Sequence, residues 1–167
     1  FALFFAAWAA GSAAASIWTG GSVGDWNVAS NWSPASVPGP ADAVSIPSGT
    51  VVAYSSNAAL SVAALTLGFP ATAPAAILRI STGLAVSGAL IVQNGAALQV
   101  ASTEAVSAQD ISLAAGSSVT LSVPAAAAAP GPALRLYVSG SLTAAGGSTI
   151  TARGRGYERW CCDSAPC

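Results

Sequence analysis

The chain has 167 residues, of which 53% are hydrophobic and 7% charged, and its formal net charge at pH 7 is -1. Without any His there is no Ser-His-Asp triad and no histidine metal site, and five basic residues provide no basic stripe for nucleic acid. The length suffices for one domain with a sizeable core, and the scarcity of charge argues against disorder.

The chain begins with an uncharged apolar segment, residues 1–17. This segment is too short and too rich in Ala for a stable membrane span. Two interpretations remain open. It is either the apolar part of a secretory signal, with Ala13, Ala14 and Ala15 as the cleavage site, or a retained segment that packs against an apolar assembly partner.

A Trp-rich stretch, residues 18–43, precedes the first predicted strand. We expect Trp18, Trp26 and Trp32 to form a cap, because the first coil of a repeat structure exposes apolar core and unpaired strand edges. A platform of aromatic rings for sugar stacking is the alternative.

Two polar residues are assigned to the same cap. Asp42 is expected to anchor the turn that leads into the first strand. Asn31, which begins the sequence Asn-Trp-Ser, is either a structural residue or an acceptor for N-linked sugar. Because Pro34 follows this sequon directly, acceptance of a sugar is disfavoured.

The central region, residues 44–152, is a repeat. Four copies align without gaps: VSIPSGTVVAY at 44–54, LIVQNGAALQV at 90–100, ISLAAGSSVTL at 111–121 and LTAAGGSTITA at 142–152. The sixth position is always Gly, namely Gly49, Gly95, Gly116 and Gly147. A further copy begins at Leu65 and ends at Ile80, after an insertion rich in Pro and Ala. The glycines are expected at corners between strands.

The first strands of the copies recur at spacings of 21, 25, 21 and 31 residues. A third short apolar pair follows most copies: Leu60 and Val62, Leu84 and Val86, Leu136 and Val138. Three short alternating strands in a basic period of 21 residues predict a parallel β-helix of about five coils, in which equivalent strands stack. An antiparallel β-sandwich of short strands is the alternative.

The C-terminal extension, residues 153–167, contains all three cysteines: Cys161, Cys162 and Cys167. An odd number leaves at least one thiol without an internal partner. The extension is therefore interpreted as the start of a disulfide-bonded module that continues further, or as a source of bonds between neighbouring subunits. Zinc binding and redox catalysis are disfavoured, because His and a C-x-x-C motif are missing.

Residues 18–46 read WTGGSVGDWNVASNWSPASVPGPADAVSI. This stretch resembles the opening segment of secreted, surface-associated parallel β-helix proteins, a group that includes autotransporter-like adhesins, matrix proteins and filament components. The resemblance continues through the coils to about Gly156. It implies a β-helix fold and an extracellular or cell-surface location, and it does not cover the cysteine-rich end.

The carboxylates are scattered: Asp25, Asp42, Glu104 and Asp110 are spread over 86 residues. A polysaccharide lyase or hydrolase needs clustered carboxylates or a basic partner. Arg79 and Arg135 are expected on outer strand faces. We therefore predict that the chain is not an enzyme and has no cofactor, catalytic residue or metal site.

The function predicted from the sequence is that of a non-enzymatic extracellular structural protein. It would form a surface fibre or matrix by self-association through the solenoid ends and residues 1–17. An adhesive or glycan-binding module of a larger cell-surface protein is the alternative, with surface glycans as partners. Neither function involves nucleic acid or a membrane span.

Overall fold

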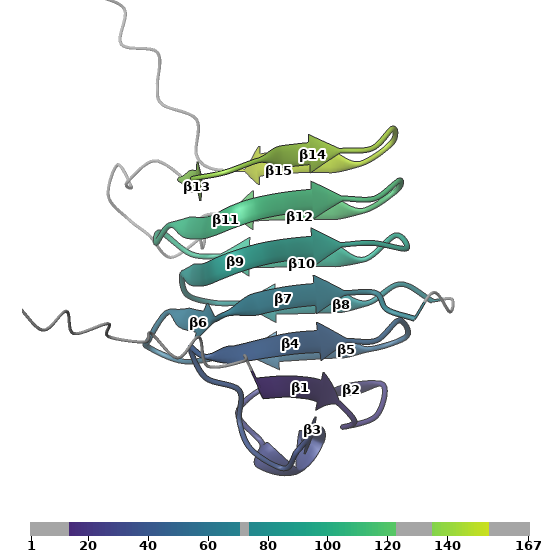
Figure 1. Cartoon of the computed structure of the whole chain (residues 1–167), viewed down its shortest axis with the longest axis vertical. Helices are drawn as coiled ribbons and strands as arrows, with labels where there is room; N and C mark the ends of the chain where they lie inside the picture. The colour runs from purple at the N-terminus through teal and green to yellow at the C-terminus, as the bar shows by residue number, and fades with distance from the viewer. Residues whose placement is uncertain (1–13, 71–73, 123–134, 154–167) are drawn as a thin grey trace, which may run out of the picture.

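The computed structural model describes residues 14–70, 74–122 and 135–153. Strands account for 54% of the structure and helix for 2%. The chain winds into a parallel β-solenoid of about four turns, with its coils stacked in one column (Figure 1). The predicted parallel β-helix is confirmed. The sandwich alternative is wrong, because successive coils pair in parallel rather than antiparallel.

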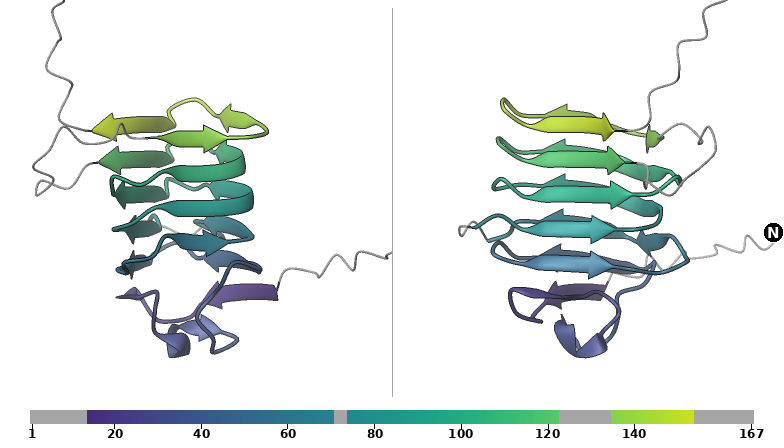
Figure 2. Two further views of the ribbon diagram at one scale, coloured as in Figure 1. Left: turned by 90° about the vertical axis from the view of Figure 1, so that its left-hand side faces the viewer. Right: turned by 180° about the vertical axis from the view of Figure 1, so that it is seen from behind.

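Two sheets form the long faces of the column. The nine-stranded first sheet contains β13 (Leu136–Val138), β14 (Leu142–Ala144), β11 (Val106–Leu113), β9 (Leu84–Val92), β6 (Leu60–Val62), β7 (Ala64–Leu67), β4 (Asp42–Ile46), β1 (Ala14–Trp18) and β3 (Trp32–Ser33). The six-stranded second sheet, seen from behind in Figure 2, has the order β15 (Thr149–Arg153), β12 (Ser118–Ser122), β10 (Ala97–Ala101), β8 (Ile77–Ile80), β5 (Val51–Tyr54) and β2 (Val23–Asp25).

The register of the stacked strands is the register of the aligned repeats. In the first sheet, a single inward column runs through Ile46, Leu67, Val92, Leu113 and Ala144. Its first four side chains are buried. Alternation along each strand directs one residue into the core and the next outward, so a constant register produces apolar columns between the sheets.

Apolar pairs in the third strand position stack in the same way. Leu60 and Val62 lie beside Leu84 and Val86. The next level is formed by Val106 and Ala108, a copy that the sequence analysis missed because Ala replaces the larger apolar residue. In β9 and β11 the third strand of one coil continues into the first strand of the next, with an irregularity after Ala108.

The four aligned glycines all lie in turns between the first and second strands, with φ between 71° and 82°. This left-handed conformation is unfavourable for residues with a Cβ. Gly68, which the alignment of copies did not single out, also has a positive φ of 87°. A Cβ at Gly68 would collide with the carbonyl oxygen of Gln93 in the coil above. The glycine there permits the close approach of two coils.

The boundary predicted at residue 17 falls inside strand β1. Ala14, Ala15, Ser16 and Ile17 pair in parallel with β4, so they form part of a level below the first repeat copy. The repeat copies themselves account for the levels from β4 and β5 up to β14 and β15. Sequence comparison missed the lowest level, because Ser16 occupies the core position that Val44 fills one level above.

Candidate functional site

The described part of the chain offers no obvious catalytic or metal centre. It contains no group of three or more His, Cys, Asp or Glu side chains that could hold a metal ion. The features considered are the two ends of the solenoid and the larger of two depressions in the described part of its surface, the one on the second sheet. They are considered in turn from the N-terminal end.

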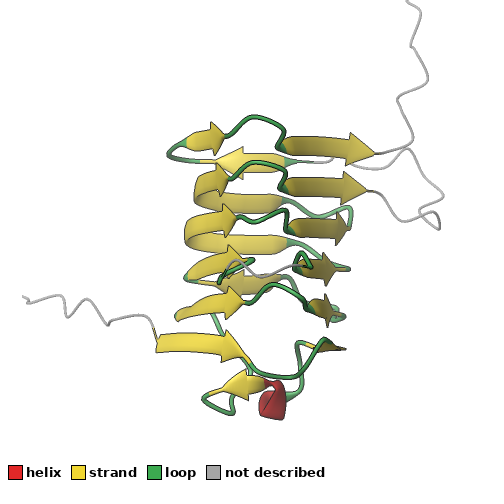
Figure 3. Ribbon diagram, turned by 90° about the vertical axis from the view of Figure 1, so that its right-hand side faces the viewer, coloured by secondary structure: helices red, strands yellow, loops and turns green. Residues whose placement is uncertain are grey.

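Three Trp residues belong to the N-terminal end of the solenoid: Trp18 ends β1, Trp26 follows β2, and Trp32 begins β3 directly after the short helical turn η1 (Ala29–Asn31), which is drawn in red in Figure 3. Trp18, Trp26 and Trp32 are no more than 3% exposed. Trp32 makes edge contacts with both of the others, with ring centroids 5.1 Å and 4.6 Å apart, and Trp26 also contacts Tyr54 of the first coil. The rings are therefore a continuation of the core, and none presents an open face for stacking on a sugar.

Hydrogen bonds tie the loops of the cap together. The indole N–H of Trp32 donates to the carbonyl of Trp26, 2.8 Å away. The side-chain amide of Asn31 donates to the carbonyl of Asp25 over 2.9 Å, and its backbone carbonyl accepts from Thr19. The nitrogen that would carry an N-linked sugar thus takes part in the cap, which favours the structural role of Asn31.

Asp42 lies at the start of β4, as the sequence indicated. Its Oδ2 accepts a hydrogen bond of 2.7 Å from the backbone N–H of Gly39, and its own N–H donates to the carbonyl of Gly39. This pair of bonds holds the turn by which the chain leaves the cap and enters the first coil.

The C-terminal end has a different character. The inward-directed side chains of the last level, Leu142 and Ile150, are 51% and 39% exposed, whereas their partners one level below, Ile111 and Val119, are buried. β13, β14 and β15 each pair with one strand only, on the side of the preceding coil. Within the described residues, apolar core and strand edges are therefore open to solvent at this end.

All carboxylates of the described residues accept hydrogen bonds from backbone N–H groups. Besides Asp42, Asp25 accepts from the N–H of Asn27 and Glu104 accepts from the N–H of Gly83 in the preceding coil, 2.7 Å away. Asp110 accepts from both the N–H and the hydroxyl of Ser141, at 2.8 Å and 2.7 Å. Glu104 and Asp110 thus connect neighbouring coils by hydrogen bonds. No two of these four carboxylates form a catalytic pair.

The two hydrogen bonds from Ser141 have an electrostatic consequence. They stabilise the ionised carboxylate and hold the pKa of Asp110 below its usual range, with the backbone N–H making the larger contribution and slight desolvation opposing both. The last coil is therefore attached to β11 partly through an ionised side chain.

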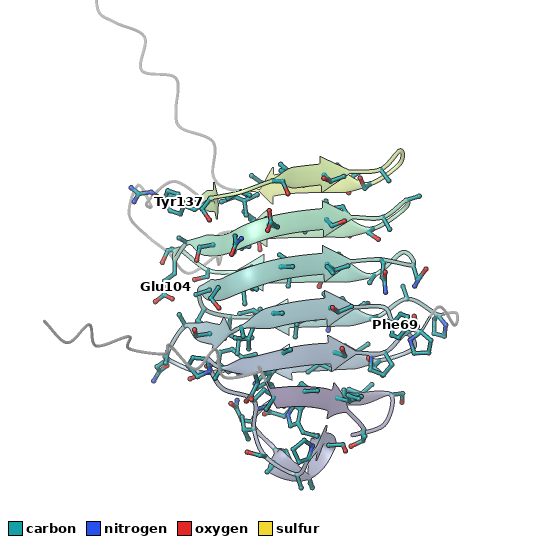
Figure 4. All side chains as sticks on the ribbon, in the orientation of Figure 1. Phe69, Glu104 and Tyr137 are labelled. Atoms are coloured by element: carbon teal, nitrogen blue, oxygen red, sulfur yellow. The ribbon has the colours of Figure 1, made fainter. Side chains whose placement is uncertain are left out.

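Large side chains mark the corners of the solenoid. Figure 4 shows Glu104 and Tyr137 at one narrow side of the column and Phe69 at the other. Tyr137 and Phe69 are exposed. Their positions at different corners and levels do not combine into a single apolar patch.

A shallow depression of about 370 Å³ crosses the outer face of the second sheet. It spans β5, β8, β10 and β12, and its polar side chains include Arg79, Gln99 and Thr120, which occupy successive levels of one outward column. The guanidinium Nε of Arg79 donates to Oε1 of Gln99 over 3.3 Å. Arg79 is exposed on β8, as predicted, whereas Arg135 is exposed but precedes β13 and lies in no strand.

Several predicted features lie outside the described residues: residues 1–13, the cysteines Cys161, Cys162 and Cys167, and most of the 153–167 extension. No helix in the part that is described is long and apolar enough to cross a membrane. Comparisons of the chain with protein-family models, curated proteins and solved structures found no match. The resemblance to surface-associated β-helix proteins therefore rests on the residues between Trp18 and Ile46 and on the repeat.

Proposed function

We propose that this chain is a non-enzymatic structural protein of the cell exterior that assembles into a surface fibre or matrix. The observation that carries the proposal is the open C-terminal end, where the core columns reach solvent at Leu142 and Ile150. Native proteins usually cover or pair such edges. A solenoid with one open end is suited to association through that end.

The use of the carboxylates supports the non-enzymatic part of the proposal. General acid–base chemistry on a glycan needs a carboxyl group held free to exchange a proton with the substrate. In the described residues, the carboxylates are instead bound to backbone N–H groups of turns and neighbouring coils. Assays on acidic polysaccharides should show no turnover, and activity that disappears in Glu104→Gln or Asp110→Asn would refute this part.

The apolar segment of residues 1–17 and the cysteines of the extension complete the proposed assembly. The segment would supply a second contact surface, and Cys161, Cys162 and Cys167 would link neighbouring subunits. Electron microscopy and light scattering of the secreted protein, with and without residues 1–13 and under oxidising and reducing conditions, test this. Fibres that depend on residues 1–13 support the proposal, and a monodisperse monomer under all conditions refutes it.

An adhesive or glycan-binding module is the second candidate. It is favoured by the depression on the second sheet, where a cation, an amide and hydroxyl groups lie on adjacent coils. The buried Trp rings give it no support. Binding of the purified protein to an array of acidic and neutral glycans, lost in Arg79→Ala, would place this function ahead of the structural one.

A further inference from the structure

We propose that the C-terminal coil is a docking surface for the C-terminal coil of a second copy, so that two solenoids join tail to tail. This inference specifies the partner and the geometry of the assembly proposed above, and it rests on that proposed function. It is argued from the opposite characters of the two ends, the absence of charge at the open end and the symmetry of strand pairing.

The N-terminal end is not a suitable partner for the open end. Below β1 the chain forms the Trp cap, and β3 pairs antiparallel with β1 at Ile17 and Trp18. The lower edge of the second sheet is β2, which ends in the charged residue Asp25. Cap loops therefore occupy the place where the open coil of another copy would have to pair, and this disfavours head-to-tail stacking.

Among the described residues, the open end lacks charge and Pro, two of the usual devices against edge pairing, although β13 and β14 are only three residues long. Proteins protect edge strands with charged residues, Pro or bulges. Residues 136–152, which make up the last level, contain no charged residue and no Pro. The first charge is Arg153, the last residue of β15. A second copy therefore meets no charge repulsion across this stretch, and a charged partner would find no complementary group in it.

Symmetry makes the same surface complementary to itself. A two-fold axis perpendicular to both the solenoid axis and the strands brings the open edges of two copies together, with β14 antiparallel to β14 and β15 antiparallel to β15. Antiparallel pairing satisfies the free backbone groups of both edges. The contact also covers Leu142 and Ile150, the side chains that continue the buried columns of Ile111 and Val119.

The chain leaves β15 at Arg153, at this same end, and the cysteine-containing extension follows. A tail-to-tail pair would therefore have both extensions starting beside the contact. Cross-links between extensions of two copies require such proximity.

Lysine substitutions at the open end test the docking surface. Leu142 and Ile150 are half-exposed, so the double variant Leu142→Lys/Ile150→Lys should fold, which circular dichroism checks. It should lose the dimer completely in sedimentation velocity under reducing conditions. Val23→Lys, at the 70% exposed apolar side chain of the opposite edge strand, is the matched control and should keep the dimer. A dimer that survives both end-coil lysines overturns the proposal.

Cross-linking tests the orientation. In a variant with Cys161, Cys162 and Cys167 replaced by Ser, a single Thr143→Cys in β14 should cross-link to itself with a short bismaleimide. Head-to-tail stacking would separate two such thiols by the height of the column, about 25–30 Å at about 4.8 Å per level. Ile17 lies at the lowest level of the same column as Thr143. A cross-link that forms only when Thr143→Cys chains are mixed with Ile17→Cys chains would overturn the tail-to-tail arrangement.

A deletion distinguishes a second copy from the chain's own extension. If the full chain is a monomer and removal of residues 154–167 produces the dimer, the extension is the natural occupant and the proposal is wrong. Tail-to-tail dimers without fibres would uphold the inference and refute the proposed fibre. Fibres with head-to-tail cross-links would support the proposed fibre and refute the tail-to-tail inference.

Discussion

At the N-terminal end of the solenoid the core is closed by the rings of Trp18, Trp26 and Trp32, whereas at the C-terminal end Leu142 and Ile150 remain about half-exposed. Both ends terminate the same stack of coils. The difference is that a dedicated segment of about 25 residues, 18–43, folds beneath the first coil, while nothing among the described residues covers the last. A repeat therefore buries its apolar residues only where another level or a cap lies next to it.

The largest expected difference in the free energy of unfolding is between a charge introduced at a middle level and the same charge introduced at the last level of one column. Leu113→Asp buries a charge without a partner and should lower the free energy of unfolding by about 5 kcal/mol, which is comparable with the whole stability of a small domain. Ala144→Asp, one level above in the same column, should cost about 1 kcal/mol or less, because Ala144 is exposed.

Urea denaturation followed by circular dichroism measures both variants. The two substitutions introduce the same charge at stacked positions of one column. They differ in the level at which the charge lies, and Leu113→Asp also removes a larger apolar side chain. Equal destabilisation by the two would contradict an open last level, and it would show that Ala144 is covered in solution.

Removal of a large apolar side chain at each end compares the cap with the open edge. Trp26→Ala should lower the free energy of unfolding by about 3–5 kcal/mol, since the ring is fully buried between Trp32 and Tyr54. Ile150→Ala should cost about 1 kcal/mol or less in dilute protein. Thermal unfolding at low concentration checks the pair, and a mild effect of Trp26→Ala would argue that the cap is dispensable.

The smallest expected effect concerns the attachment of the last coil through Asp110. Its pKa is lowered in the folded state by the two donors of Ser141, so the stabilisation is present at pH values above the unfolded pKa of about 3.9. It is lost as the pH falls through the lower folded value. The difference in urea midpoint between the natural chain and Asp110→Asn should therefore shrink between pH 7 and pH 3.

Nuclear magnetic resonance titration of the Asp110 carboxyl group measures the pKa itself. Ser141→Ala removes the hydroxyl donor but keeps the backbone donor, so it should return the pKa only part of the way toward the usual value. A pKa at or above the usual range in the natural chain would contradict the hydrogen-bonded connection between β11 and the last coil.

The amino-acid sequence by itself indicated the register of the copies and favoured parallel stacking over an antiparallel sandwich, which the structure then excluded. The two-residue alternation and the constant Gly position left one consistent way to superpose the copies, and the columns through Ile46 and Val92 follow it. It also indicated the cap, because three Trp residues directly precede the first coil. These features are local or periodic, so they can be read along a single chain.

Other features were decided only by the tertiary structure. Ser16 was not recognisable as a core residue, because its burial depends on pairing with Val44, 28 residues away. The roles of Glu104 and Asp110 depend on backbone N–H groups 21 and 31 residues away, which no local pattern reveals. Leu142 has the same strand pattern as Ile111, and its exposure follows only from its place at the last level. The burial of a side chain in a solenoid depends on which coils lie above and below it, and the sequence of a single coil carries no information about those neighbours.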